Sequence, residues 1–322
     1  MPTAAPAPRP VIGAMGELLV EFVCSEKDGR NLRPAPYIGP FPSGAPGIFI
    51  DQAARAGARA VFAGAVGADA FGEVILARLA EAGVAPDLLR RLPGETTGSA
   101  HVSYNSDGSR DFVFNMARSA AGRFPHGQEA LDGFRRAGTV VLHISGSALG
   151  DPAMRAHLFE VAMALADEGV DLSIDPNIRI ELMADAGYLD TLRALVGRAA
   201  YVLPSDADAD LLWPGRGFAD WSGEVLAQGA RVVALKRGAA GAVARDQDQT
   251  VDMPGHAVTV VDPTGAGDCF CGTFVTRLAA GDGLALALSR ANAAGALAVT
   301  RLGPMEGNST LAAIDAFGGG QG

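Results

Sequence analysis

The chain has 322 residues, of which 48% are hydrophobic and 19% are charged, so it is long and apolar enough to bury a large core. Its formal net charge of −10 argues against nucleic acid or an anionic membrane surface as a partner. An anionic substrate would therefore have to be bound by local backbone dipoles and a few cationic side chains. The three cysteines, Cys24, Cys269 and Cys271, show neither metal-ligand spacing nor an even disulfide set, which indicates reduced core residues in a cytoplasmic protein.

The N-terminal residues 1–10 are rich in Ala and Pro and lack the apolar stretch of a signal peptide. We therefore expect a disordered leader there. No apolar run in the sequence is long enough to span a membrane.

A strand is predicted over residues 11–23, where Glu17, Leu19 and Glu21 alternate onto one face. Acidic side chains at a strand end suit the binding of hydroxyl groups, although a solvent-exposed strand face explains the same pattern. A Gly/Pro-rich loop at 39–47 follows, and a helix is predicted over about 48–56. Such a loop lets backbone approach a ligand closely.

Strands and helices then alternate, which predicts βαβ units and a parallel sheet. The predicted elements are a strand at 60–66, a helix that begins after its N-cap Asp69 and ends at Gly83, a strand at 139–145, a helix at 153–167 and strands at 171–175, 201–204 and 231–235. A hairpin predicted over 98–115, with its turn at 105–108, departs from this rhythm. We expect it to be a lid that excludes water from the site.

Polar residues and glycines follow several of these strands. Because ligands bind where parallel strands end, such residues are better site candidates than polar residues elsewhere. The candidates are Asn177 and Arg179 after the strand at 171–175, Ser205 and Asp208 after the strand at 201–204, and Lys236, Arg237, Gly238 and Gly241 after the strand at 231–235. Two structural alternatives stand beside them: Arg179 pairs with Asp175, and Asp208 is a helix N-terminal charge.

The sequence Asp262-Pro263-Thr264-Gly265-Ala266-Gly267-Asp268 lies between a strand predicted at 256–261 and a helical pattern that runs to Gly281. A helix that starts at Gly-Ala-Gly presents unpaired amides at the positive end of its dipole, where phosphoryl charge is stabilised. Asp268 then lies in the first helical turn as a candidate general base, or as a helix N-terminal charge alone.

This heptapeptide resembles the second signature of the PfkB (ribokinase-like) carbohydrate kinases, and the resemblance runs from about residue 11 to 317. It implies a ribokinase-like α/β domain at 11–318, with a central, mostly parallel sheet, helices on both faces and a small β lid from segments of about 16–44 and 96–118. Residues 319–322 are expected to be a flexible tail. In that family the aspartate matching Asp268 removes the proton from a sugar hydroxyl, and the amides of Gly265, Ala266 and Gly267 form the anion hole.

The resemblance also implies roles for the other candidates. ATP contacts are expected from Asn177, Arg179, Ser205, Lys236, Arg237, Gly238, Gly241 and Asn292, and substrate contacts from Glu21, Ser43, Gly44, Phe114, Arg118 and Asp268. Asp208 is the candidate for Mg²⁺, and Asp262, Thr264, Ala298, Arg301 and Gly303 are those for a monovalent cation such as K⁺. Lid strands of related kinases often pair between subunits, which implies a homodimer.

The chain departs from the family pattern at positions that matter for the substrate. Ile48 stands where the family has a sugar-binding Asn, and Met116 stands where relatives that act on 2-keto-3-deoxygluconate place an Arg. The change at Ile48 weakens the assignment of a particular sugar by analogy, whereas the absence of the Arg at Met116 favours an ATP-dependent kinase for a neutral ketohexose such as tagatose or fructose. A 2-keto-3-deoxygluconate kinase, a nucleoside kinase and a non-catalytic sugar sensor remain alternatives, whereas a nicotinamide oxidoreductase lacks its dinucleotide fingerprint.

Overall fold

The computed structural model describes residues 9–107, 109–123, 127–183 and 185–319. Most of the expected leader and tail lie outside these ranges, as does Gly108 of the predicted hairpin turn. Arg9 and Pro10, which the sequence placed in the leader, are bonded to the main body: the Arg9 Nε donates to Gly57 O, and Pro10 O accepts from the Arg59 amide. No helix among the described residues has the length and apolarity to cross a membrane.

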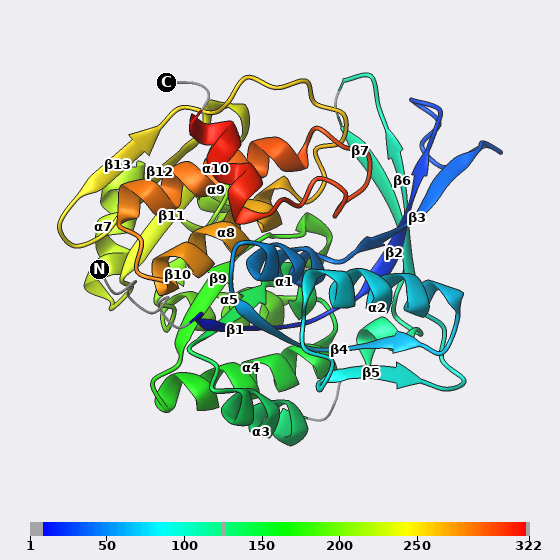
Figure 1. Cartoon of the computed structure of the whole chain (residues 1–322), viewed down its shortest axis with the longest axis horizontal. Helices are drawn as coiled ribbons and strands as arrows, with labels where there is room; N and C mark the ends of the chain where they lie inside the picture. The colour runs from blue at the N-terminus through cyan, green and yellow to red at the C-terminus, as the bar shows by residue number, and fades with distance from the viewer. Residues whose placement is uncertain (1–8, 108, 124–126, 184, 320–322) are drawn as a thin grey trace, which may run out of the picture.

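A nine-stranded sheet forms the centre of the fold (Figure 1). Its order is β13-β12-β11-β10-β9-β8-β1-β4-β5; β11 to β5 run parallel, and β12 and β13 add an antiparallel hairpin at one edge. The strands are β1 (Val11–Met15), β4 (Arg59–Gly67), β5 (Leu89–Leu92), β8 (Val141–Ser145), β9 (Asp171–Asp175), β10 (Tyr201–Val202), β11 (Val232–Lys236), β12 (Ala242–Arg245) and β13 (Thr250–Met253).

Helices cover both faces of this sheet (Figure 1). One core cluster packs Phe134, Leu158 and Trp221 against the sheet, and the other packs Phe49, Phe274 and Leu288. The helices are α1 (Ala45–Arg55), α2 (Ala70–Ala82), α3 (Gly127–Ala137), α4 (Pro152–Asp167), α5 (Ala186–Val196), α6 (Asp206–Leu212), α7 (Phe218–Ala227), α8 (Ala266–Ala279), α9 (Leu284–Ala298) and α10 (Leu311–Gly319). Because helices shield both faces, the parallel strands β1, β4 and β11 are mostly apolar. The three cysteines are free and buried, as predicted.

A second sheet of four strands, in the order β3-β2-β6-β7, stands at one end of the molecule (Figure 1). Its strands are β2 (Leu19–Cys24), β3 (Tyr37–Ser43), β6 (Gly98–Tyr104) and β7 (Arg110–Asn115). The predicted hairpin is therefore confirmed as β6–β7, and β2 and β3 complete the sheet. The predicted architecture, a mostly parallel sheet with helices on both faces and a small β lid, is confirmed.

Three local predictions are wrong. Residues 11–23 form two strands in different sheets, because the chain turns at Gly16, whose φ of 152° and close approach to Pro46 leave no room for a side chain. The loop predicted at 39–47 is replaced by β3 and the start of α1; prolines are tolerated there because β3 is an edge strand. Residues 254–261 form no strand, and Val260 and Val261 are exposed.

A buried ion-pair cluster ties three segments together. Asp51 of α1 is fully buried and accepts hydrogen bonds from Arg55 Nε (2.9 Å), Arg78 Nε of α2 (3.0 Å) and Asn308 Nδ2 (2.6 Å). Arg78 also donates to Met305 O at 2.6 Å. The loop that carries residues 303–308 is thereby fixed to the helices beside the sheet.

We expect Asp51→Asn to lower the free energy of unfolding by about 3–5 kcal/mol, because it leaves two partly buried guanidinium groups without their shared carboxylate. Urea unfolding measures the loss. Glu168→Gln is the control, since its pair with Arg135 is solvent-exposed and such a pair is worth about 0–1 kcal/mol. An Asp51→Asn loss no larger than that of the control would contradict the assignment.

Candidate active site

The carboxyl ends of the parallel strands, the start of α8 and the small sheet enclose a cavity of about 1420 Å³. Asp175 at the end of β9 and Lys236 at the end of β11 line it, and Phe112 and Phe114 of β7 approach from the small sheet. This is the edge at which open parallel sheets bind ligands.

The start of α8 forms one wall of this cavity. Gly265 is the N-cap residue with φ of 81°, and a Cβ there would lie 2.4 Å from Pro304 O, so only glycine fits. Ala266 and Gly267 open the helix, and all three residues line the cavity. The first amides of a helix lack intrahelical acceptors, which makes this wall suitable for an anion.

Asp268 lies in the first turn of α8 and is 8% exposed. Burial, with a further contribution from the charge of Asp175, raises the pKa of Asp268 to about 8, against the opposing effects of Lys236 and Arg179. A carboxylate that gains basicity in this way, inside a cavity, is suited to general-base chemistry near neutral pH.

The basic side chains predicted to contact the phosphates of ATP lie in different places. Lys236 is buried in an ion pair with Asp175, and although burial alone would lower the pKa of Lys236, Asp175 holds it above its ordinary value. Arg237 pairs instead with Asp252 of β13 and does not line the cavity. Arg179 does line the cavity and, among the described residues, forms no ion pair with Asp175, which removes that structural alternative.

Ser205 and Asp208 line the cavity, and their side chains also cap the N-terminus of α6. They form the capping box of α6, and the Asp208 carboxylate accepts from the Ser205 and Ile178 amides and the Ser205 hydroxyl. Over the described ranges no three His, Cys, Asp or Glu side chains cluster as a ready-made metal site. A magnesium ion at Asp208 would therefore be held largely through its own waters and through phosphate.

Glu17 and Glu21 face the cavity from the opposite side, and neither is exposed, so the exposed-strand interpretation is wrong. Ser147 Oγ donates to Glu17 Oε1 at 2.8 Å, and Ser43 Oγ to Glu21 Oε2 at 3.4 Å. Among the residues that the structure describes, the second oxygen of each carboxylate is buried and has no hydrogen-bond partner. Burial, with the charge of Asp262 adding to it, raises the pKa of Glu21 to about 7, and burial also raises the pKa of Glu17.

The arginine on the lid that faces the cavity is Arg110, not the predicted Arg118. Arg118 is exposed and lies outside the lining, whereas Arg110 and Met116 line the cavity with the half-exposed Phe114. Of the cavity-lining residues Glu17, Glu21 and Arg110, Glu21 was predicted to bind substrate, whereas the other two were not among the predicted site residues. Alternation on one face signalled Glu17, but no local pattern distinguishes Arg110 from Arg118.

The predicted nucleotide end is lined by Gly238, Gly241 and Asn292. Gly241 has φ of 94°, and a Cβ there would lie 2.2 Å from Met253 O. Asn292 of α9 is 9% exposed and donates to Pro254 O at 3.3 Å, which leaves its side-chain oxygen for a ligand. The segment predicted as a strand at 256–261 contributes His256, Ala257, Val258 and Val260 to the cavity lining.

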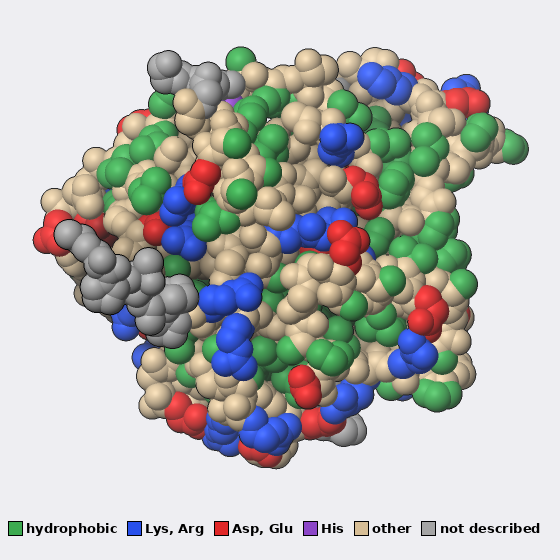
Figure 2. Space-filling view, viewed as in Figure 1, with side chains coloured by type: hydrophobic (Ala, Val, Ile, Leu, Met, Phe, Trp, Pro, Cys, Tyr) green, Lys and Arg blue, Asp and Glu red, His purple; other side chains and the backbone are tan. Residues whose placement is uncertain are grey.

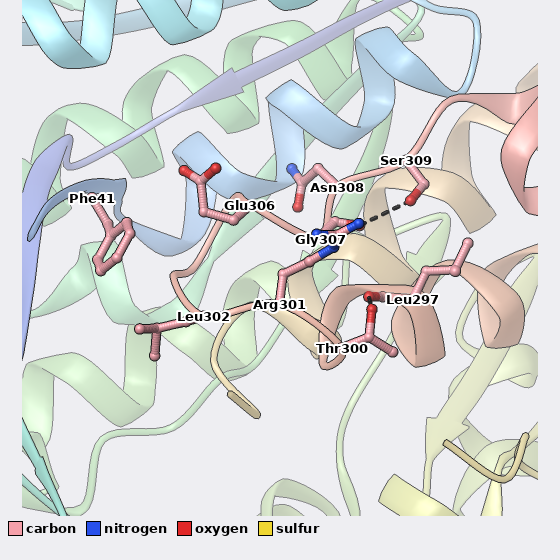
Figure 3. Close-up of a pocket in the computed structure, with 9 residues that line it drawn as sticks. All are labelled: Phe41, Leu297, Thr300, Arg301, Leu302, Glu306, Gly307, Asn308 and Ser309. Carbon is pink, nitrogen blue, oxygen red and sulfur yellow. Dashed lines mark hydrogen bonds between the residues drawn. The ribbon is translucent and has the colours of Figure 1, made fainter. Parts of the chain in front are cut away.

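Among the residues predicted to hold a monovalent cation, Thr264 and Gly303 contact Asp262, whereas the Arg301 side chain lies elsewhere. Asp262 is fully buried and accepts from the Thr264 and Gly303 amides, each at 2.9 Å. Ala298 is buried at the end of α9, and the carbonyl of the next residue, Val299, accepts a hydrogen bond from the Asp262 amide at 3.2 Å. The Arg301 side chain instead lines a second cavity of about 590 Å³, with Phe41, Glu306 and Ser309 around it (Figure 3).

Comparison with known proteins agrees with this geometry. The family model described as pfkB family carbohydrate kinase matches residues 15–311. Fructokinase-1 of Oryza sativa subsp. japonica is 30% identical over 307 residues, which are 91% of this chain and 93% of the relative. An E. coli protein provisionally described as Ribokinase II, solved in complex with ATP and Mg²⁺, gives a TM-score of 0.89 at 36% identity, with 96% of this chain and 98% of that chain covered.

Fructokinase from Vibrio cholerae O395, solved in a fructose-, ADP- and calcium-bound form, gives a TM-score of 0.80 at 26% identity, with 96% and 99% of the two chains covered. These similarities extend over nearly the whole of each protein and include both sheets. The fold is thus ribokinase-like, as predicted. The chain belongs to the pfkB family of carbohydrate kinases.

Proposed function

We propose that this protein transfers the γ-phosphoryl group of ATP to a hydroxyl of a ketohexose, with fructose as the first candidate and tagatose as the second. The observation that carries the proposal is the placement of Asp268, buried with a raised pKa, at the start of the α8 amides and in one cavity with Glu17 and Glu21. The similarity to an ATP- and Mg²⁺-bound structure and to a fructose-bound kinase supports the choice of substrates.

In the proposed reaction the sugar hydroxyl loses its proton to the Asp268 carboxylate as its oxygen bonds to the γ-phosphorus. The bond from that phosphorus to the bridging oxygen breaks, and ADP leaves. The amides of Gly265, Ala266 and Gly267 stabilise the charge on the transferred group, and Lys236 and Arg179 supply positive charge near it. Bound Mg²⁺ would neutralise phosphate charge at this end of the cavity. The small sheet excludes water.

The substrate end favours a neutral polyhydroxylated molecule. Glu17 and Glu21 each have a buried oxygen without a partner, and hydroxyl groups would satisfy both. A sugar acid would bring a third carboxylate into this wall. The alternative, a 2-keto-3-deoxygluconate kinase, requires Arg110 or Arg179 to hold that carboxylate, since both line the cavity.

K⁺ remains a prediction. The Asp262 carboxylate already receives hydrogen bonds from two amides and from Tyr104. A cation at this position would have to compete with those donors, so the residues do not present a vacant carboxylate. We propose no step of the reaction that depends on it.

We also propose a cytoplasmic homodimer that associates through the small sheet. Apolar side chains gather on the protruding small sheet, at the right of Figure 2, and Ile38 and Val113 are 46% and 47% exposed. Exposed apolar side chains grouped on one sheet are typical of an interaction surface.

Substrate identity is tested by measuring ADP release from Mg-ATP with fructose, tagatose, ribose, 2-keto-3-deoxygluconate and adenosine, each with and without K⁺. We expect the highest kcat/KM with fructose or tagatose, because these sugars offer neutral hydroxyls to Glu17 and Glu21. A signal from the sugar acid alone would instead assign Arg110 or Arg179 to its carboxylate. Sugar binding without ADP release from any compound would support a non-catalytic sensor.

Asp268→Asn should lower kcat by at least about a hundredfold, because it removes the general base while keeping the size of the side chain. ATP binding, measured by calorimetry, should change little, because the α8 amides remain. Asp210→Asn serves as the matched control, since Asp210 is exposed on α6 and outside the cavity lining. Near-normal turnover of Asp268→Asn would contradict the mechanism.

The same variant should be more stable than the wild type at pH 8. Asp268 has a raised pKa in the folded state, so the folded wild type binds more protons than the unfolded chain between about pH 4 and 8. Its stability therefore falls as pH rises through this window, whereas an amide makes no such contribution. Thermal midpoints at pH 5 and pH 8 measure the difference, and a gap between variant and wild type that does not widen with pH would contradict the raised pKa.

Val113→Glu should weaken the dimer by at least about tenfold, because it places a charge in an apolar contact. Light scattering after size exclusion measures the mass over a concentration series, against 32.9 kDa for one chain. Val140→Glu is the control, since Val140 is also 47% exposed but precedes β8 in the large domain. A monomeric wild type, or equal effects of both variants, would overturn the proposed interface.

A further inference from the structure

The Tyr104 hydroxyl joins the small sheet to the turn that leads into α8. Tyr104 is the last residue of β6. Its hydroxyl donates to Asp262 Oδ1, and it lies 2.9 Å from Thr264 Oγ1. From the neighbouring strand, Arg110 Nη1 also reaches Thr264 Oγ1, at 3.4 Å. Both strands of the lid hairpin thus contact one short segment of the large domain.

The recipient carboxylate depends on these donors. Asp262 is fully buried and, within the described part of the chain, has no ion-pair partner. Its charge is met by the Thr264 amide, the Gly303 amide and the Tyr104 hydroxyl. The loss of a hydrogen bond costs a buried carboxylate more free energy than it costs an exposed one, because no water replaces the lost donor. The lid therefore supplies one of the three contacts that hold Asp262 in place.

Asp262 in turn sets the geometry of the anion hole. Its Oδ1 bond to the Thr264 amide shapes the turn, and its Oδ2 bond to the Gly303 amide fixes that turn to the loop at 303–304. The next residue is Gly265, whose backbone passes so close to Pro304 O that no side chain fits. A shift of the Asp262 turn must consequently move the amides that begin at Gly265.

The hydroxyl is suited to act as a permanent donor. An ionised carboxylate can only accept hydrogen bonds, so in the contact with Asp262 Oδ1 the Tyr104 hydroxyl is the donor. The groups that face it are acidic or neutral apart from Arg110: Asp262, Thr264 and the nearby Glu21.

We propose that Tyr104 is a positioning residue that fastens the lid to Asp262 and holds the α8 amides in the arrangement that receives the transferred phosphoryl group. The inference rests on the proposed kinase function. Because β6 is paired with β2, which carries Glu21, a sugar bound at Glu21 contacts the same sheet that carries Tyr104. Substrate binding, lid closure and the geometry of the anion hole are thereby coupled.

The test is Tyr104→Phe, which removes one oxygen atom and little volume. We expect kcat to fall by about tenfold, the effect of losing one hydrogen bond to a charged group. The ratio of ATP hydrolysed to sugar phosphorylated should rise, because a loosened lid admits water. A residue that only stabilised the fold would lower the thermal midpoint without changing this ratio.

Tyr37→Phe is the matched control. Tyr37 lies on β3 of the same sheet, and its hydroxyl donates to Asn31 Oδ1 at 2.7 Å, outside the cavity lining. It removes the same atom from the same sheet, and we expect wild-type kcat and coupling. Equal effects of the two variants would assign the result to the stability of the sheet and overturn the proposal.

Amide hydrogen exchange provides a readout that does not depend on the sugar. In Tyr104→Phe without substrate, exchange should rise by about tenfold in β6, in β7 and in the segment 262–268, and remain unchanged in Tyr37→Phe. Unchanged exchange at 262–268 overturns the proposal. If no sugar is phosphorylated by the wild type, the kinase proposal fails, while this measurement still decides whether the lid holds the turn.

Thr264→Val gives a second route to the same contact. It removes the other partner of the Tyr104 hydroxyl, and the two changes together should raise exchange at 265–268 by less than the product of their separate effects, because they break one shared network. Fully multiplicative effects would show that Tyr104 and Thr264 act independently, which contradicts the proposal.

Discussion

The site depends on the way the chain enters α8. Gly265 must adopt a left-handed backbone against Pro304, and Asp262 must be held by donors from two other segments, before the first amides of the helix can face the cavity. The buried Asp51 cluster fixes the loop that supplies Gly303 and Pro304. A set of buried polar contacts outside the cavity lining therefore determines where phosphoryl charge would be received.

Electrostatics explain how a chain of net charge −10 accommodates a nucleotide. Lys236 is the buried cation at the strand ends, and its charge is largely matched by Asp175. Uncompensated attraction for phosphate must then come mainly from the helix amides and Arg179. Burial raises the pKa of Asp268, and the neighbouring carboxylates of Asp175 and Glu17 add to the rise. The same carboxylates that weaken anion binding in the cavity therefore help to make Asp268 a stronger base.

The sequence predicted those features that are encoded locally. The Asp69 cap with Gly83, the lid hairpin and the Asp268 turn each have short-range signals, and the structure contains all three elements. It did not predict that residues 11–23 divide between two sheets, because alternation reports which side chains share a face and not which sheet they join. The sequence also did not indicate which of Lys236 and Arg237 faces the cavity. Consecutive residues at a strand end point to opposite sides, and here Lys236 points into the cavity whereas Arg237 pairs with Asp252.

The buried carboxylates of the cavity determine which ligand would favour contact between the small sheet and the large domain. Glu17 and Glu21 each retain a buried oxygen to which no group in the described part of the chain donates, and Asp268 adds a third carboxyl group to the same cavity. Sugar hydroxyls are the donors that would relieve this cost, and they would do so only when the sheet bearing Glu21 lies over the large domain. Closure is then favoured by substrate through differential interaction with the closed state. Because the neighbouring strand ends at Tyr104, whose hydroxyl bonds to Asp262, a sugar held by Glu21 would stabilise the same contact and, through it, the turn that leads into the anion hole.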